Sequence, residues 1–134
     1  MKGLTIHRRV RFPTARNWQP NVGAAQSRQA GRIPRVARLV ALAIRLERML
    51  TAGVVPNCSV LADLGHVSRA RVTQITHLTL LAPDIQEAIL FLPPVTAGRD
   101  PITERDLRPI AAEPVWSRQR ELWSHLRDRK CRSA

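Results

Sequence analysis

The sequence predicts an all-α fold: a compact multi-helix domain with a central helix-turn-helix, preceded by a flexible basic N-terminal arm. Apolar residues make up 44% of the 134 residues, which is enough for the core of one domain. Aromatic residues are few, with three Trp, two Phe and no Tyr, so the core must rest mainly on Leu, Ile, Val and Ala. This composition suits packed helices, and apolar residues recur at helical spacing through most of the chain.

The limits of this periodicity divide the chain into three segments. Residues 1–33 contain scattered Pro, Gly, Gln and Arg without a regular period, apart from a short β-like patch over residues 6–12. We therefore expect a poorly ordered basic arm there. Residues 34–128 form the predicted helical domain, and residues 129–134 form a basic tail.

The first two helices are predicted from their apolar spacing. Pro34 is a favourable first-turn residue, and Gly53 is a stop signal. Between them the apolar positions share one face: Val36, Leu39, Val40, Ala43, Ile44, Leu46 and Leu50. The opposite face carries arginines: Arg35, Arg38, Arg45 and Arg48. A loop over residues 54–57 leads to a second helical segment over residues 59–64.

The later helices are predicted mainly from their caps. Ser68 caps a helix that runs to about residue 81, and Pro83 begins the next one, which ends before residues 93–94. Thr103 and Asp106 have the three-residue spacing of a capping box for a helix over residues 104–110. After Pro114, a last amphipathic helix has one apolar face: Val115, Trp116, Gln119, Leu122, Trp123 and Leu126.

The segment over residues 59–81 has the pattern of a helix-turn-helix. Leu61, Ala62 and Leu64 are expected to face inward from its first helix, and Val67 is expected to fill the turn. Ala62 is small enough to let two helices cross closely. In the second helix, the expected inward positions are Val72, Ile75 and Leu78.

Short polar side chains occupy the remaining face of the second helix, where base edges are met in the major groove. Arg69 can donate two hydrogen bonds to guanine, and Gln74 can pair with adenine. Thr73 can reach a phosphate or a thymine methyl group, and the amides at the Ser68 cap favour a nearby phosphate. The predicted DNA-binding residues are Ser68, Arg69, Ala70, Arg71, Thr73, Gln74 and His77, together with Arg35 and Arg38 of the first helix.

The charge of the chain supports a polyanionic partner. There are 22 basic and 10 acidic residues, which give a formal net charge of +12. Residues 1–48 carry Lys2 and ten Arg against one acid, Glu47. An Arg-biased genome would explain the preference for Arg over Lys, but it would not explain the net charge. We therefore expect double-stranded DNA as the partner.

The stretch from Leu61 to Ile75 (LADLGHVSRARVTQI) resembles the helix-turn-helix of ParB/KorB-type DNA-binding domains. Residues 80–89 (LLAPDIQEAI) are similar to the helix that follows it in that family, and the resemblance extends over about residues 35–111. It implies an all-helical module in which Ser68, Arg69, Thr73 and Gln74 face DNA, in proteins that segregate plasmids or regulate transcription. The family usually has Gly at the position of His66.

A second resemblance concerns residues 98–107 (GRDPITERDL). They are similar to small relatives of this module that accompany recombinases of phages and transposons. A recombinase is therefore a further expected partner, and mobile-element maintenance is an expected setting.

Enzyme and metal sites are not predicted. Cys58 and Cys131 lie far apart, and the four His residues share no ligand spacing, so no metal and no cofactor is expected. The chain has no Tyr for a recombinase nucleophile and no Gly-rich phosphate loop. Its best apolar stretch, residues 36–46, is interrupted by two Arg, so we expect no membrane span and a cytoplasmic, nucleoid-associated protein.

Two other functions remain open at this stage. One is a basic helical adaptor whose helix-turn-helix is vestigial. The other is RNA binding, which lacks an aromatic platform on which bases could stack. A homodimer is also expected, because Trp116 and Trp123 lie seven residues apart on one face of the last helix. The alternative for this stripe is packing against the protein's own core.

Overall fold

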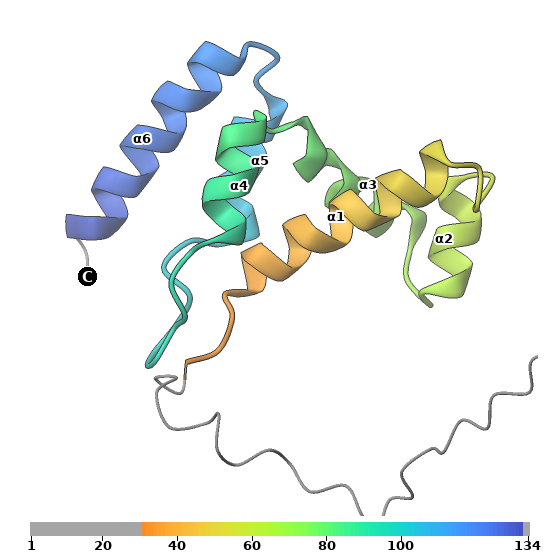
Figure 1. Cartoon of the computed structure of the whole chain (residues 1–134), viewed down its shortest axis with the longest axis horizontal. Coiled ribbons are helices and arrows are strands. Elements are labelled where there is room, and N and C mark those ends of the chain that lie inside the picture. The colour runs from red at the N-terminus through yellow and green to blue at the C-terminus, as the bar shows by residue number, and fades with distance from the viewer. Residues whose placement is uncertain (1–30, 133–134) are drawn as a thin grey trace, which may run out of the picture.

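The computed structural model describes residues 31–132, and within them the fold is all-α, as predicted. The arm over residues 1–30, with its β-like patch, lies outside the described residues. Figure 1 shows α1 running across the molecule, with α2 at its C-terminal end and α6 beyond α4 and α5. The elements in chain order are α1 (Arg35–Thr51), α2 (Cys58–Leu64), α3 (Arg69–Thr76), the 3₁₀ helix η3 (His77–Leu80), α4 (Pro83–Leu90), α5 (Glu104–Ala112) and α6 (Trp116–Arg132).

Several predicted boundaries differ from the structure. Two differ by only one or two residues, because α2 begins at Cys58 and α5 ends at Ala112. The helix that Ser68 caps changes to a 3₁₀ turn at His77 instead of continuing as an α-helix to residue 81. The last helix continues to Arg132, so most of the predicted tail is helical. Residues 31–33, assigned to the arm, lie against the loop before α5, because the backbone of Arg32 exchanges hydrogen bonds of 3.0 and 2.9 Å with Val95.

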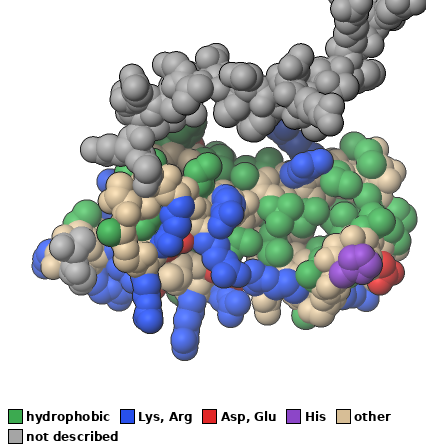
Figure 2. All heavy atoms as spheres, turned by 90° about the horizontal axis from the view of Figure 1, so that it is seen from below, with side chains coloured by type: hydrophobic (Ala, Val, Ile, Leu, Met, Phe, Trp, Pro, Cys, Tyr) green, Lys and Arg blue, Asp and Glu red, His purple; other side chains and the backbone are tan. Residues whose placement is uncertain are grey.

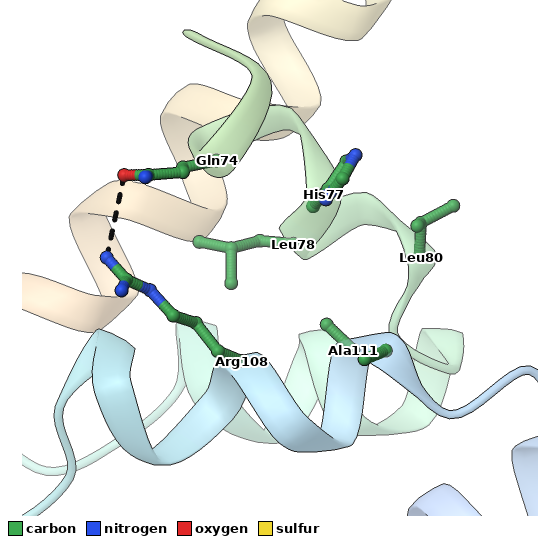
Figure 3. Close-up of a pocket in the computed structure, with 7 residues that line it drawn as sticks. Gln74, His77, Leu78, Leu80, Arg108 and Ala111 are labelled. Carbon is green, nitrogen blue, oxygen red and sulfur yellow. Dashed lines mark hydrogen bonds between the residues drawn. The ribbon is translucent and has the colours of Figure 1, made fainter. Parts of the chain in front are cut away.

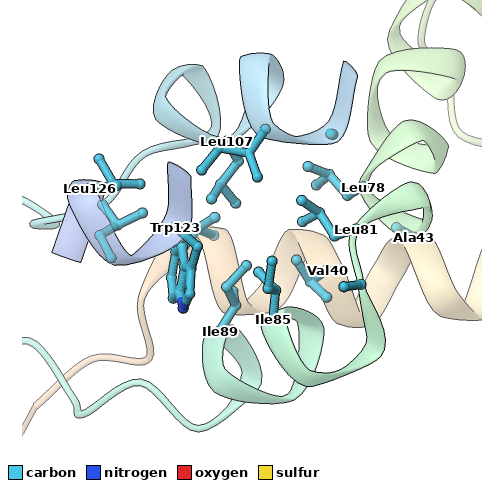
Figure 4. Close-up of a cluster of buried hydrophobic side chains, with 14 of the residues drawn as sticks. Val40, Ala43, Leu78, Leu81, Ile85, Ile89, Leu107, Trp123 and Leu126 are labelled. Atoms are coloured by element: carbon cyan, nitrogen blue, oxygen red, sulfur yellow. The ribbon is translucent and has the colours of Figure 1, made fainter. Parts of the chain in front are cut away.

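A main core joins α1, η3, α4, α5 and α6 (Figure 4). Three of the four buried side chains of α1, those of Val36, Val40 and Ala43, lie on the predicted stripe, and Ala37 is the exception. Val40 and Ala43 share this core with Leu78, Leu81 and Ile85. Each such side chain removed from water stabilises the fold by roughly 1.5–3 kcal/mol for Val, Leu or Ile. The stripe on α1 packs against η3 and α4, and α5 in turn packs against η3 and α6.

A second, smaller core belongs to the helix-turn-helix. Val55, Leu61, Ala62 and Val72 are buried together, next to partly buried side chains at the end of α1. Two inward positions were predicted wrongly, because Leu64 is 66% exposed and Val67 is 45% exposed. The small core closes over Leu61 and Ala62 and leaves the last turn of α2 uncovered.

Gln119 attaches α6 to the rest of the domain. Its side chain is buried, its Oε1 accepts a 2.7 Å hydrogen bond from the Ala82 amide, and its Nε2 donates to the carbonyls of Leu80 and Glu113 at 3.1 and 2.7 Å. A buried amide with all these partners orients the helix as well as stabilising it, since any shift would leave polar atoms unpaired.

Candidate nucleic-acid interface

The helix-turn-helix is capped at both of its helices. Asn57 caps α2 by accepting hydrogen bonds from the amides of Ser59 and Val60 at 2.9 and 3.1 Å. Ser68 caps α3, as predicted, because its Oγ accepts from the Arg71 amide at 3.2 Å. These short-range bonds satisfy amides that a helix start leaves without partners. The start of α3 is as predicted, whereas α2 begins at Cys58, one residue before its predicted start.

The turn between the two helices is closed by the backbone. His66 has a φ of 50°, in the left-handed region that Gly adopts most easily. Its amide donates to the Asp63 carbonyl at 3.2 Å, and the Val67 amide donates to the Ala62 carbonyl at 3.0 Å. These bonds explain why the Val67 side chain is not needed to fill the turn.

The outer face of α3 presents most of the predicted DNA-binding residues to solvent. Arg69, Ala70, Gln74 and His77 are exposed, and so is Ser68 at the cap. Thr73 is half-buried, and its hydroxyl donates to the Arg69 carbonyl at 3.1 Å. In that rotamer its methyl group and hydroxyl oxygen remain the groups that a DNA partner could use.

Arg71 differs from its neighbours because it is engaged within the protein. Its guanidinium donates two hydrogen bonds to the Glu104 carboxylate, at 2.7 and 2.9 Å, in the bidentate geometry that Arg favours. The hydrogen bond that Arg71 donates to Glu104 raises the pKa of Arg71, and the same bond lowers the pKa of Glu104 against the effect of burial. Arg71 therefore joins α3 to α5 and fixes the position of α3 on the domain.

Arg108 lies beside the candidate site, although its sequence context does not indicate this. Its Nη2 lies 3.5 Å from Gln74 Oε1 and 3.3 Å from Glu104 Oε1 (Figure 3). Arg71 also donates to Gln74 Oε1, at 3.3 Å. The amide of Gln74 is thus oriented by two guanidinium groups, 3 and 34 positions away in the chain. Residues three positions apart are neighbours on one helix face, so the sequence indicates the contact of Gln74 with Arg71 but not the contact with Arg108.

The two predicted contacts on α1 lie apart from α3. Arg35 and Arg38 are exposed near the start of α1, beside the loop over residues 98–103. The Arg35 amide donates to Asp100 Oδ2 at 2.7 Å, and this bond is the main reason that the pKa of Asp100 is lowered. Arg32 also pairs with Asp100, at 2.7 Å.

Basic side chains gather on one face of the molecule, with small acidic patches among them (Figure 2). In residues 31–132 no group of three or more His, Cys, Asp or Glu is arranged to hold a metal ion. No helix in that range is long and apolar enough to cross a bilayer. Comparison of the chain with protein families, with curated proteins and with solved structures finds no match.

The apolar face of α6, through which a homodimer was expected, is partly buried and partly exposed. Trp123 is 6% exposed and packs in the main core, whereas Trp116 is 50% exposed. Leu122 is exposed as well. Trp123 therefore follows the alternative that the sequence left open, and only Trp116 and Leu122 remain accessible to a partner.

Proposed function

We propose that this protein binds double-stranded DNA with sequence specificity, by placing α3 in the major groove. One observation supports this above the others: a capped helix follows a tight turn and presents Arg69 and Gln74 outward, while Val72 and Ile75 hold it to the core. His77 is exposed at the start of the 3₁₀ helix that follows. A helix held in this way can enter a groove with its N-terminal side chains toward base edges.

The proposed role is that of a small regulator, or an accessory factor of plasmid or mobile-element maintenance. The support is the resemblance of residues 61–89 to ParB/KorB-type domains and of residues 98–107 to proteins that accompany recombinases. We propose a binding protein rather than an enzyme, located with the DNA of the nucleoid. The proposed protein partners are a recombinase and a second copy of the chain.

Selection of bound sequences from a random duplex library tests the proposal. We expect the wild-type chain to recover a short motif. A variant carrying Arg69→Ala and Gln74→Ala should lose that motif, and Arg118→Ala on the exposed surface of α6 is the matched control that should keep it. If the wild-type chain recovers no motif, the proposal fails and the adaptor function is favoured instead.

A further inference from the structure

A path of arginines leads from the reading helix to the start of α1. Three neighbouring surface hollows share residues along this path. The first is lined by Gln74, His77 and Arg108, the second by Arg108, Arg105 and Arg35, and the third by Arg35, Arg38 and Arg99. Because each hollow shares an arginine with the next, the surface is continuous. The arginine track is defined as Arg35, Arg38, Arg99, Arg105 and Arg108.

The two acids along the track are already paired. Asp100 accepts from Arg32 and from the Arg35 amide, and Glu104 accepts a bidentate pair from Arg71. Within residues 31–132, no salt bridge involves Arg38, Arg99 or Arg105. Arg108 lies 3.3 Å from the Glu104 carboxylate, and Asp100 interacts electrostatically with Arg38. The five arginines of the track still outnumber these two acids, so the track has an excess of positive charge.

We propose that the arginine track binds the phosphate backbone of the DNA duplex to one side of the site that α3 reads. This inference rests on the proposed function. Guanidinium groups match phosphate oxygens in charge and in geometry, and most contacts that position a protein on DNA are made to phosphates. Continuity with Gln74 through Arg108 favours the same duplex over a separate partner.

The composition of the track also argues against single-stranded RNA. No aromatic side chain lines the second or the third hollow, so bases would have no surface on which to stack. Backbone phosphates of a duplex need no such surface. The track thus extends the footprint of the protein without adding base readout, and it lies on the part of the fold that continues into the basic residues before position 31.

Two arginines that the sequence did not single out provide the test. The track variant is Arg99→Gln with Arg105→Gln, since both side chains are exposed and neither forms a salt bridge within residues 31–132. The control variant removes the same charge from α6, by Arg118→Gln with Arg127→Gln. Arg127 lies about two helical turns after Arg120, so the two side chains share a face of α6. Arg120 of this face pairs with Asp84 of α4, and no residue of α6 belongs to the arginine track. Equal melting temperatures would show that all three proteins are folded.

The first readout is the salt dependence of binding to a duplex of random sequence. We expect the log–log slope to fall by about 0.9 for each phosphate contact that the track variant loses, and to stay near the wild-type slope in the control. The second readout is the gain in affinity when about ten flanking base pairs are added to one end of the preferred site. The track variant should lose this gain, and the control should keep it.

Several outcomes overturn the inference. Equal slopes in the wild-type chain and the track variant would mean that Arg99 and Arg105 do not contact phosphate. An equal reduction of the slope in the track variant and the control would mean that binding depends only on the net charge of the protein. An unchanged DNA slope together with lost retention on polyglutamate would assign the track to an acidic protein partner. By contrast, the track variant could show a lowered salt slope while the wild-type chain selects no motif. That result would support phosphate binding by the track and reject base reading by α3.

Discussion

His66 is the residue on which the turn of the helix-turn-helix depends. Its φ of 50° is a conformation that costs an L-residue about 1–2 kcal/mol, although His tolerates it better than most. Replacing it with Gly removes that cost but adds backbone entropy to the unfolded chain. We expect His66→Gly to raise the free energy of unfolding by about 0.5–1 kcal/mol, measured by urea denaturation.

Gly65 provides the control for this prediction. Its φ of −88° is ordinary, but an added Cβ would lie 3.3 Å from the Leu61 carbonyl oxygen. Gly65→Ala should therefore bring no comparable gain. A loss of stability in His66→Gly would mean that the imidazole makes a contribution larger than its backbone cost.

Glu104 makes the stability of the domain depend on pH. Its pKa is lowered mainly by the hydrogen bond from Arg71, so the unfolded chain binds its proton more readily than the folded chain. The stabilisation is therefore complete above the ordinary pKa of Glu and is lost as the pH falls through the lowered value. We expect Glu104→Gln to cost about 1–2 kcal/mol at neutral pH and to differ less from the wild type in acid.

Urea unfolding from about pH 7 to about pH 3 measures this difference. Asp84→Asn is the comparison, because the Asp84–Arg120 pair is exposed on both sides and should contribute little. If the difference in unfolding free energy between the wild type and Glu104→Gln stays constant with pH, the pair with Arg71 does not lower the pKa of Glu104.

At the scale of the element, α3 should discriminate between sequences. Arg69→Ala or Gln74→Ala should weaken binding to the preferred site by about 1–3 kcal/mol and binding to random duplex far less, because base contacts are lost only on the former. Titrations of both duplexes measure this. If the two weaken equally, these side chains contact phosphate and do not read bases.

The geometry around α3 suggests a second variant, at Arg108 of the neighbouring helix α5. Arg108 and Arg71 both approach Gln74 Oε1 at distances above 3.2 Å, which are long for charged donors. These bonds orient the amide without holding it tightly. Arg108→Gln should therefore change the preferred base at the position that Gln74 meets more than it changes the folding of α3.

At the scale of the whole molecule, the two Trp residues of α6 should respond differently. Trp123 is buried in the main core, so Trp123→Ala should cost about 3–5 kcal/mol of stability. Trp116 is half exposed, so Trp116→Ala should leave a folded protein. If α6 forms the proposed seam, the Trp116 variant should dissociate more readily in sedimentation. A wild-type chain that stays monomeric at high micromolar concentration, free and on DNA, would contradict the dimer.

Sequence alone determined the helices and most of their starts. Asn57 was not recognised as a cap, but Ser68 and the Thr103–Asp106 box were, and the structure confirms both. The stripe on α1 is also as predicted. These features depend on residues within one or two turns of each other, where spacing in the sequence determines spacing in space.

Only the tertiary structure decided which side chains are engaged and which are available. The Arg71–Glu104 pair joins residues 33 positions apart, and no local pattern distinguishes it from the exposed Arg69. The same holds for the split between Trp116 and Trp123, because amphipathic spacing shows that a helix has an apolar face but not how far its neighbours extend along it. The arginine track exists for this reason too: α1, the loop before α5 and α5 itself each contribute arginines, and packing alone brings them to one surface.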